Sequence, residues 1–154
     1  MSENRVTTEE IAELVERNRE AAGAYINGNM RRYLELVRAS EDYTLMSPFG
    51  GDTVHGSDES DEAVEATSQF FRGGDADLEI EQTYASGQMV VLVGVERQHG
   101  EVGGLPDQDW SLRVTLVFRR EGSQWWLVHR HADPLVHGID MKQLSALARG
   151  RDPD

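Results

Sequence analysis

The period of the hydrophobic pattern changes near residue 75, and this change constrains the fold more than any other feature of the sequence. Before it, apolar side chains recur every three or four positions, as on one face of a helix. After it, apolar and polar side chains alternate, as on a strand with one buried face. Helices followed by successive strands predict an α+β fold, in which a curved antiparallel or mixed sheet wraps around three N-terminal helices.

The predicted helices have recognisable ends. The expected caps and stops are Thr7, with Glu10 completing a capping box, and Gly28 for the first helix; Asn29 for the second; Ser57 and Gly73-Gly74 for the third; and Asp140 for a last helix over residues 141–148. A short strand over residues 41–47 is expected between the second and third helices. Later strands are expected over residues 77–84, 89–95, 110–120 and 125–133.

The strand over residues 89–95 is apolar on both faces, which predicts a central position in the sheet that is covered on two sides. The three helices can cover only one face. The other face is therefore expected to meet a partner subunit.

The last predicted strand decides where several polar side chains point. Uninterrupted alternation places Trp125, Leu127, His129, His131 and Asp133 on one face, and Trp126, Val128 and Arg130 on the other. The first face runs from a large apolar anchor to two imidazoles and a carboxylate, as on the wall of a pocket. Arg130 is expected at an edge or an interface.

Composition limits the class of protein. A chain of 154 residues fits one domain. We expect a disordered start over residues 1–6, a domain over 7–140, and a C-terminal helix with a polar tail over 141–154. The formal net charge of −13 argues against nucleic acid as a partner. The chain has no cysteine, no secretory signal and no apolar run long enough for a membrane span, so a cytoplasmic location is expected.

Three motifs, in their order along the chain, resemble the SnoaL-like branch of the nuclear-transport-factor-2-like superfamily, which has a cystatin-like α+β cone. They are Asn27-Gly28-Asn29-Met30, the run from Tyr43 to Gly50 with Gly56 behind it, and the run from Phe118 to His131. The last contains Gly-x-x-Trp followed by Val-His-x-His and is the most specific. The resemblance covers about residues 7–140 and implies a cone-shaped pocket and a homodimer.

The superfamily includes ketosteroid isomerases, cyclases, dehydratases and epoxide hydrolases, so the resemblance alone does not give a function. The isomerase residues are missing under ungapped matching. Its general-base aspartate falls at Ser47, its oxyanion-hole tyrosine at Ala21 and its protonated aspartic acid at Val114. A serine cannot remove a carbon-bound proton near neutral pH, so steroid isomerisation is excluded.

Chemistry is expected mainly from the last strand. His131 with Asp133 is the predicted acid–base pair, and Arg113 would stabilise developing negative charge. Side chains two positions apart on a strand lie roughly 7 Å apart, so a direct bond between the pair would need a bulge or a turn. In the alternative interpretation the histidines are satisfied by structural hydrogen bonds, and Arg113 forms an ion pair with Glu96 or Asp133. Neither a metal nor a cofactor is predicted.

The sequence therefore predicts binding of a small apolar molecule, with cyclase-, dehydratase- or hydrolase-like turnover left open. A non-catalytic dimerisation or ligand-binding module is the alternative. The expected ligand-binding residues are Tyr25, Tyr33, Met46, Phe49, His55, Trp110, Trp125 and His129.

Overall fold

The computed structural model describes residues 5–150 and has one mixed sheet with helices against one face. The elements are α1 (Thr8–Ile26), α2 (Met30–Leu36), β1 (Ala39–Met46), β2 (Val54–His55), α3 (Asp61–Phe70), β3 (Phe71–Ser86), β4 (Met89–Val102), β5 (Gln108–Asp109), β6 (Leu112–Glu121), β7 (Gln124–Asp133) and α4 (Met141–Arg149). The sheet order is β2-β1-β7-β6-β4-β3, with β5 paired to β4. β1 runs parallel to β7 and the other pairs are antiparallel. The predicted α+β class with a curved mixed sheet is confirmed.

The helices begin where local capping predicts, with one exception. Thr7 and Glu10 form the capping box of α1, with backbone-to-side-chain distances of 3.0 and 3.1 Å. Asn29 caps α2 and Asp140 caps α4. The expected cap at Ser57 is wrong: α3 starts at Asp61, and Ser60 accepts from the Ala63 amide.

The third helix also ends earlier than expected, at Phe70, because the two glycines that follow belong to β3. A Cβ on Gly74 would lie 1.9 Å from the His99 carbonyl oxygen. The glycine therefore permits a close approach of β3 to β4, where any side chain would collide with backbone.

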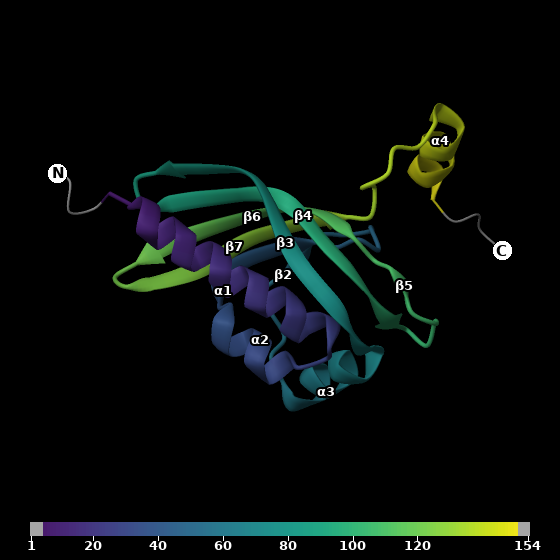
Figure 1. The fold of residues 1–154 in the computed structure, drawn as a ribbon, viewed down its shortest axis with the longest axis horizontal. Helices are drawn as coiled ribbons and strands as arrows, with labels where there is room; N and C mark the ends of the chain where they lie inside the picture. The colour runs from purple at the N-terminus through teal and green to yellow at the C-terminus, as the bar shows by residue number, and fades with distance from the viewer. Residues whose placement is uncertain (1–4, 151–154) are drawn as a thin grey trace.

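The hydrophobic core lies between α1 and the sheet. Figure 1 shows α1 lying across the sheet, and α2 and α3 follow against α1 and β3. We call the sheet face toward these helices the inner face and its opposite the outer face. The main buried core residues are Leu14, Val15, Ala21, Leu36, Val37, Tyr43, Leu78, Val90, Leu92, Val114, Leu116, Phe118, Leu127 and Ala132.

One extra residue interrupts the alternation along β7. Phe118 of β6 pairs with Leu127 and the preceding Val117 pairs with His129, so Val128 is left as a β-bulge. A one-residue insertion transfers every later side chain to the opposite face. The predicted uninterrupted alternation is therefore wrong.

After the bulge, Arg130 and Ala132 join Leu127 on the inner face, opposite the buried Leu116 and Val114 of β6. His129, His131 and Asp133 consequently lie on the outer face. The expected position of Arg130 at an edge or interface is corrected by the same shift.

The ends of the chain add little to the core. Val6 packs against it, although it belongs to the stretch expected to be disordered, while residues 1–4 and 151–154 of the predicted start and tail lie outside the described residues. Figure 1 shows α4 apart from the sheet, and its apolar side chains are exposed. No helix among residues 5–150 is both long and apolar enough to cross a membrane.

Candidate ligand site on the inner face of the sheet

A largely buried ion pair occupies the inner face. Glu96 ends the apolar stretch of β4, and the bulge in β7 turns Arg130 toward it. The two guanidinium Nη atoms donate to the two carboxylate oxygens at 2.7 and 2.8 Å. The side chains are 9% exposed for Glu96 and 20% for Arg130. Burial alone would lower the pKa of Arg130, but the charge and hydrogen bonds of Glu96 raise it overall, so the guanidinium stays charged.

Three tyrosines lie within electrostatic range of this ion pair, one each from α1, α2 and β1. They are Tyr25, Tyr33 and Tyr43, and the electrostatic influence of Arg130 extends to all three. The rings of Tyr25 and Tyr33 meet edge to face at 5.0 Å. Burial raises the pKa of each hydroxyl, and the positive charge of Arg130 opposes that rise only in part. All three hydroxyls are therefore neutral hydrogen-bond donors near pH 7.

The tyrosine hydroxyls have no hydrogen-bond partner in the described part of the protein. Within residues 5–150, none of the three makes a hydrogen bond to the protein, and no side-chain polar atom sealed from solvent lacks a partner. Each hydroxyl must therefore border space that water can enter. Nε of Arg130 likewise makes no hydrogen bond to the described residues and borders such space. We call Tyr25, Tyr33, Tyr43, Glu96 and Arg130 the inner cluster.

A row of aromatic rings leads from the inner cluster to the surface. Successive centroids lie 4.8 Å apart from Tyr25 to Phe71, 5.2 Å from Phe71 to Phe70 and 6.3 Å from Phe70 to Phe49. Phe70 lines an open hollow of about 630 Å³ at the surface, together with Leu105 and residues of α3 and β4. The inner cluster and this hollow are thus joined by apolar side chains.

The predicted acid–base residues lie on the other side of the sheet. Arg113 donates to both oxygens of Asp133, at 2.8 and 2.9 Å, so the alternative interpretation as an ion pair is confirmed for these two residues. The hydrogen bond from Arg113 lowers the pKa of Asp133 more than partial burial raises it. Asp133 also accepts from the Leu135 amide, and it makes no hydrogen bond to His131, which is exposed.

His129 is held on the outer face by β1. Its Nδ1 lies 2.8 Å from Thr44 Oγ1 and 3.1 Å from the Thr44 carbonyl oxygen. The rings of His129 and His131 are 6.5 Å apart. The alternation of side chains along β7 thus brings the two histidines and Asp133 onto one face, as predicted. That face is directed away from α1.

The other predicted ligand-binding residues are dispersed. Met46, Phe49 and His55 are exposed, Trp110 donates its indole N–H to the Gly100 carbonyl oxygen at 3.1 Å, and Trp125 packs against the core beneath the guanidinium of Arg120. Phe49 is linked to Tyr25 only through the rings of Phe70 and Phe71, and the structure does not gather the others with Tyr25 and Tyr33.

Sequence reasoning missed Glu96, Arg130 and Tyr43 as site residues. A charged residue directly after a strand that is apolar on both faces was an available signal, because a buried carboxylate needs a cationic partner. The partner could not be identified without knowledge of the bulge.

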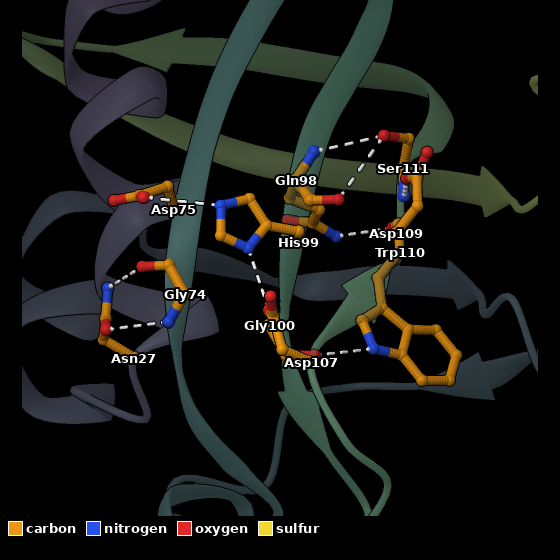
Figure 2. A network of polar contacts seen from close by, with 10 residues as sticks. All are labelled: Asn27, Gly74, Asp75, Gln98, His99, Gly100, Asp107, Asp109, Trp110 and Ser111. Carbon is orange, nitrogen blue, oxygen red and sulfur yellow. Dashed lines mark hydrogen bonds and ion pairs between the residues drawn. The ribbon is translucent and has the colours of Figure 1, made fainter.

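A second polar network ties β3, β4 and the loop before β5 together (Figure 2). His99 of β4 lies between two carboxylates, with Nδ1 2.8 Å from Asp107 and Nε2 3.4 Å from Asp75. The hydrogen bond and charge of Asp107 raise the pKa of His99, with a smaller contribution from Asp75. No group of three or more His, Asp or Glu side chains within residues 5–150 is arranged to hold a metal ion.

Comparison with known proteins identifies the class. A SnoaL-like domain family matches residues 14–136, and the chain belongs to that family. No functionally curated protein matches it.

Solved structures share the fold. They include a cystatin-like protein of unknown function from Nostoc punctiforme, at 16% identity and TM-score 0.63, covering 84% of this chain and 93% of that chain. A proposed dehydratase of the nuclear-transport-factor-2-like family from Streptomyces avermitilis matches at 18% identity and TM-score 0.61, covering 84% and 96%. A proposed calcium/calmodulin-dependent protein kinase II association domain from Xanthomonas campestris matches at 16% identity and TM-score 0.59, covering 86% of this chain and 90% of that chain.

Proposed function

We propose that the protein binds a small, largely apolar molecule between the helices and the inner face, with the polar end of the molecule at the inner cluster. The observation that carries this proposal is the set of three hydroxyls without protein partners near a largely buried guanidinium. Binding sites of small molecules are mostly apolar with a few convergent polar groups, and this arrangement has that composition.

The surroundings of the inner cluster support an apolar body for the ligand. The ring of Tyr25 contacts the rings of Tyr33 and Phe71 edge to face, and the residues of the hydrophobic core on the inner face are apolar. A ligand there would exchange water for apolar side chains while its polar end pairs with the hydroxyls.

A thermal-shift screen tests this proposal. The panel contains small apolar molecules with one hydroxyl or carbonyl group, and the proteins are wild type, Tyr33→Phe, His131→Ala and Tyr84→Phe. We expect ligands that raise the melting temperature of wild type to lose much of that effect in Tyr33→Phe alone. Tyr84 is an exposed tyrosine of β3 and serves as the matched control.

The acid–base role of His131, Asp133 and Arg113 is a separate proposal with the same screen as its test. It requires a substrate on the outer face, because the register of β7 places all three groups there. Ligand effects lost in His131→Ala but kept in Tyr33→Phe would support that site and contradict the inner one.

A homodimer through the outer face is the proposed partner interaction, in a protein that we expect to be cytoplasmic. Val91, Val93 and Val117 lie on this face, opposite the helices, and are only partly buried. A row of valines on a face that the helices do not cover favours a second subunit as its cover. This proposal is independent of the ligand.

A further inference from the structure

We infer that the inner cluster selects a neutral carbonyl compound, a ketone or an ester, over a carboxylate of the same size and over a hydrocarbon. The inference rests on the proposed function and names the ligand class of that same site. It follows from how the ion pair and the hydroxyls divide their hydrogen-bonding capacity.

The carboxylate of Glu96 already occupies the site on Arg130 that a ligand carboxylate would take. Guanidinium groups recognise carboxylates through two parallel N–H donors, and both Nη atoms of Arg130 donate to Glu96 in that way. A ligand carboxylate would have to displace Glu96 or lie beside it. Displacement would leave Glu96, a buried carboxylate, without its cation.

The charge balance of the cluster points the same way. Arg130 and Glu96 neutralise each other, and the three tyrosines are neutral near pH 7 because burial raises the pKa of each hydroxyl. An anion would add a net charge to a buried site near Glu96, and the chain as a whole already carries −13. A neutral molecule adds none.

The hydroxyls disfavour a pure hydrocarbon. A hydrocarbon would displace water from the hydroxyls of Tyr25, Tyr33 and Tyr43 without replacing its hydrogen bonds, so those polar groups would be left unpaired. A carbonyl oxygen accepts two hydrogen bonds and can pair with these donors or with Nε of Arg130.

The experiment is an NMR titration of the full chain with acetophenone, benzoate and toluene, three probes built on the same ring. The signals followed are the Nε–H of Arg130 and the ring carbons of Tyr25, Tyr33 and Tyr43. We expect acetophenone to bind at least about tenfold more tightly than either other probe, as one net hydrogen bond or an avoided charge burial implies. Tyr33→Phe should reduce that preference, and Tyr84→Phe should not.

The outcomes separate the inference from the proposal beneath it. Benzoate or toluene binding as tightly as acetophenone, while moving the same inner-cluster signals, would overturn the selectivity and leave the ligand site in place. If none of the three probes moves these signals at saturating concentration, both the inference and the proposed function fail. Tyr33→Phe keeps the aromatic ring, so the variant is expected to fold. Unchanged backbone NMR signals from β6 and β7 would confirm this.

Discussion

Arg130 and Arg113 lie on adjacent strands of the sheet but have different environments. Arg130 faces inward and pairs with a carboxylate that is 9% exposed, while Arg113 faces outward with 55% of its side chain exposed. A buried charge that loses its partner is costly, whereas an exposed ion pair contributes little. The sequence could suggest the Arg113–Asp133 pair, because the two residues fall on neighbouring predicted strands. The Arg130–Glu96 pair depends on a bulge that the sequence does not show.

The substitutions Arg130→Met and Arg113→Met should therefore differ sharply in stability. We expect Arg130→Met to lower the free energy of unfolding by about 3 kcal/mol, because Glu96 is left as a buried unpaired carboxylate. Arg113→Met should cost less than about 1 kcal/mol. Urea unfolding followed by circular dichroism measures both.

The double variant Arg130→Met/Glu96→Leu completes this test. It should be more stable than Arg130→Met, since replacing both partners removes the unpaired charge. Equal losses for the two single variants would show that the inner pair is as solvated as the outer one.

At the scale of elements, capping and hydrophobic period were sufficient to predict most helices and strands. The Thr7 capping box, the Asn29 cap and the Asp140 cap are local hydrogen-bond patterns, so four consecutive residues specify them. The bulge at Val128 has no such local signature, because it depends on how β7 pairs with β6. That single residue decides which side chains of β7 face the inner cluster.

The turn between α1 and α2 offers a test of close packing between elements. Gly28 has φ of +72°, and a Cβ there would lie 2.3 Å from the Phe71 carbonyl oxygen. Gly87, in the β3–β4 hairpin, has φ of +59° and open space around it. We expect Gly87→Ala to cost about 1 kcal/mol for its backbone conformation and Gly28→Ala clearly more. Thermal unfolding compares them, and similar losses would contradict a backbone contact at Gly28.

His99 should make the link between β3, β4 and the loop before β5 dependent on pH. A histidine whose folded pKa is raised adds stability below its unfolded pKa, near 6.5, and that contribution is lost as the pH rises through the folded pKa. We expect wild type to lose more of its stability than His99→Asn between pH 6 and pH 9. Urea titrations of both proteins at the two pH values measure this difference. An equal loss of unfolding free energy in the variant and in wild type would contradict the prediction.

For the whole molecule, the order of helices and strands and a few motifs were enough to predict the family and its α+β fold. The packing of helices against the sheet depends on the overall pattern of apolar residues. One extra residue in a strand does not change that packing. The candidate site does not tolerate it, because the identity of the inward side chains reverses at the bulge. Fold and site therefore differ in how far sequence determines them.

The proposed dimer makes a prediction at this scale. Light scattering of wild type should give twice the chain mass of 17.3 kDa. Val117→Lys should dissociate it, because a charge would be buried at the centre of the outer face. Ala66→Lys on the exposed side of α3 is the control and should remain dimeric. A monomeric wild type, or a dimer unaffected by Val117→Lys, would contradict the proposed interface.

The most direct measurement of the central claim is a single NMR titration, with the ligand from the screen that raises the melting temperature most. It follows the ring signals of Tyr25, Tyr33 and Tyr43 on the inner side and of His129 and His131 on the outer side. Binding at the inner cluster predicts that the three tyrosine signals move and saturate together while both histidine signals stay in place. Movement of the histidine signals with the tyrosines unchanged would contradict it.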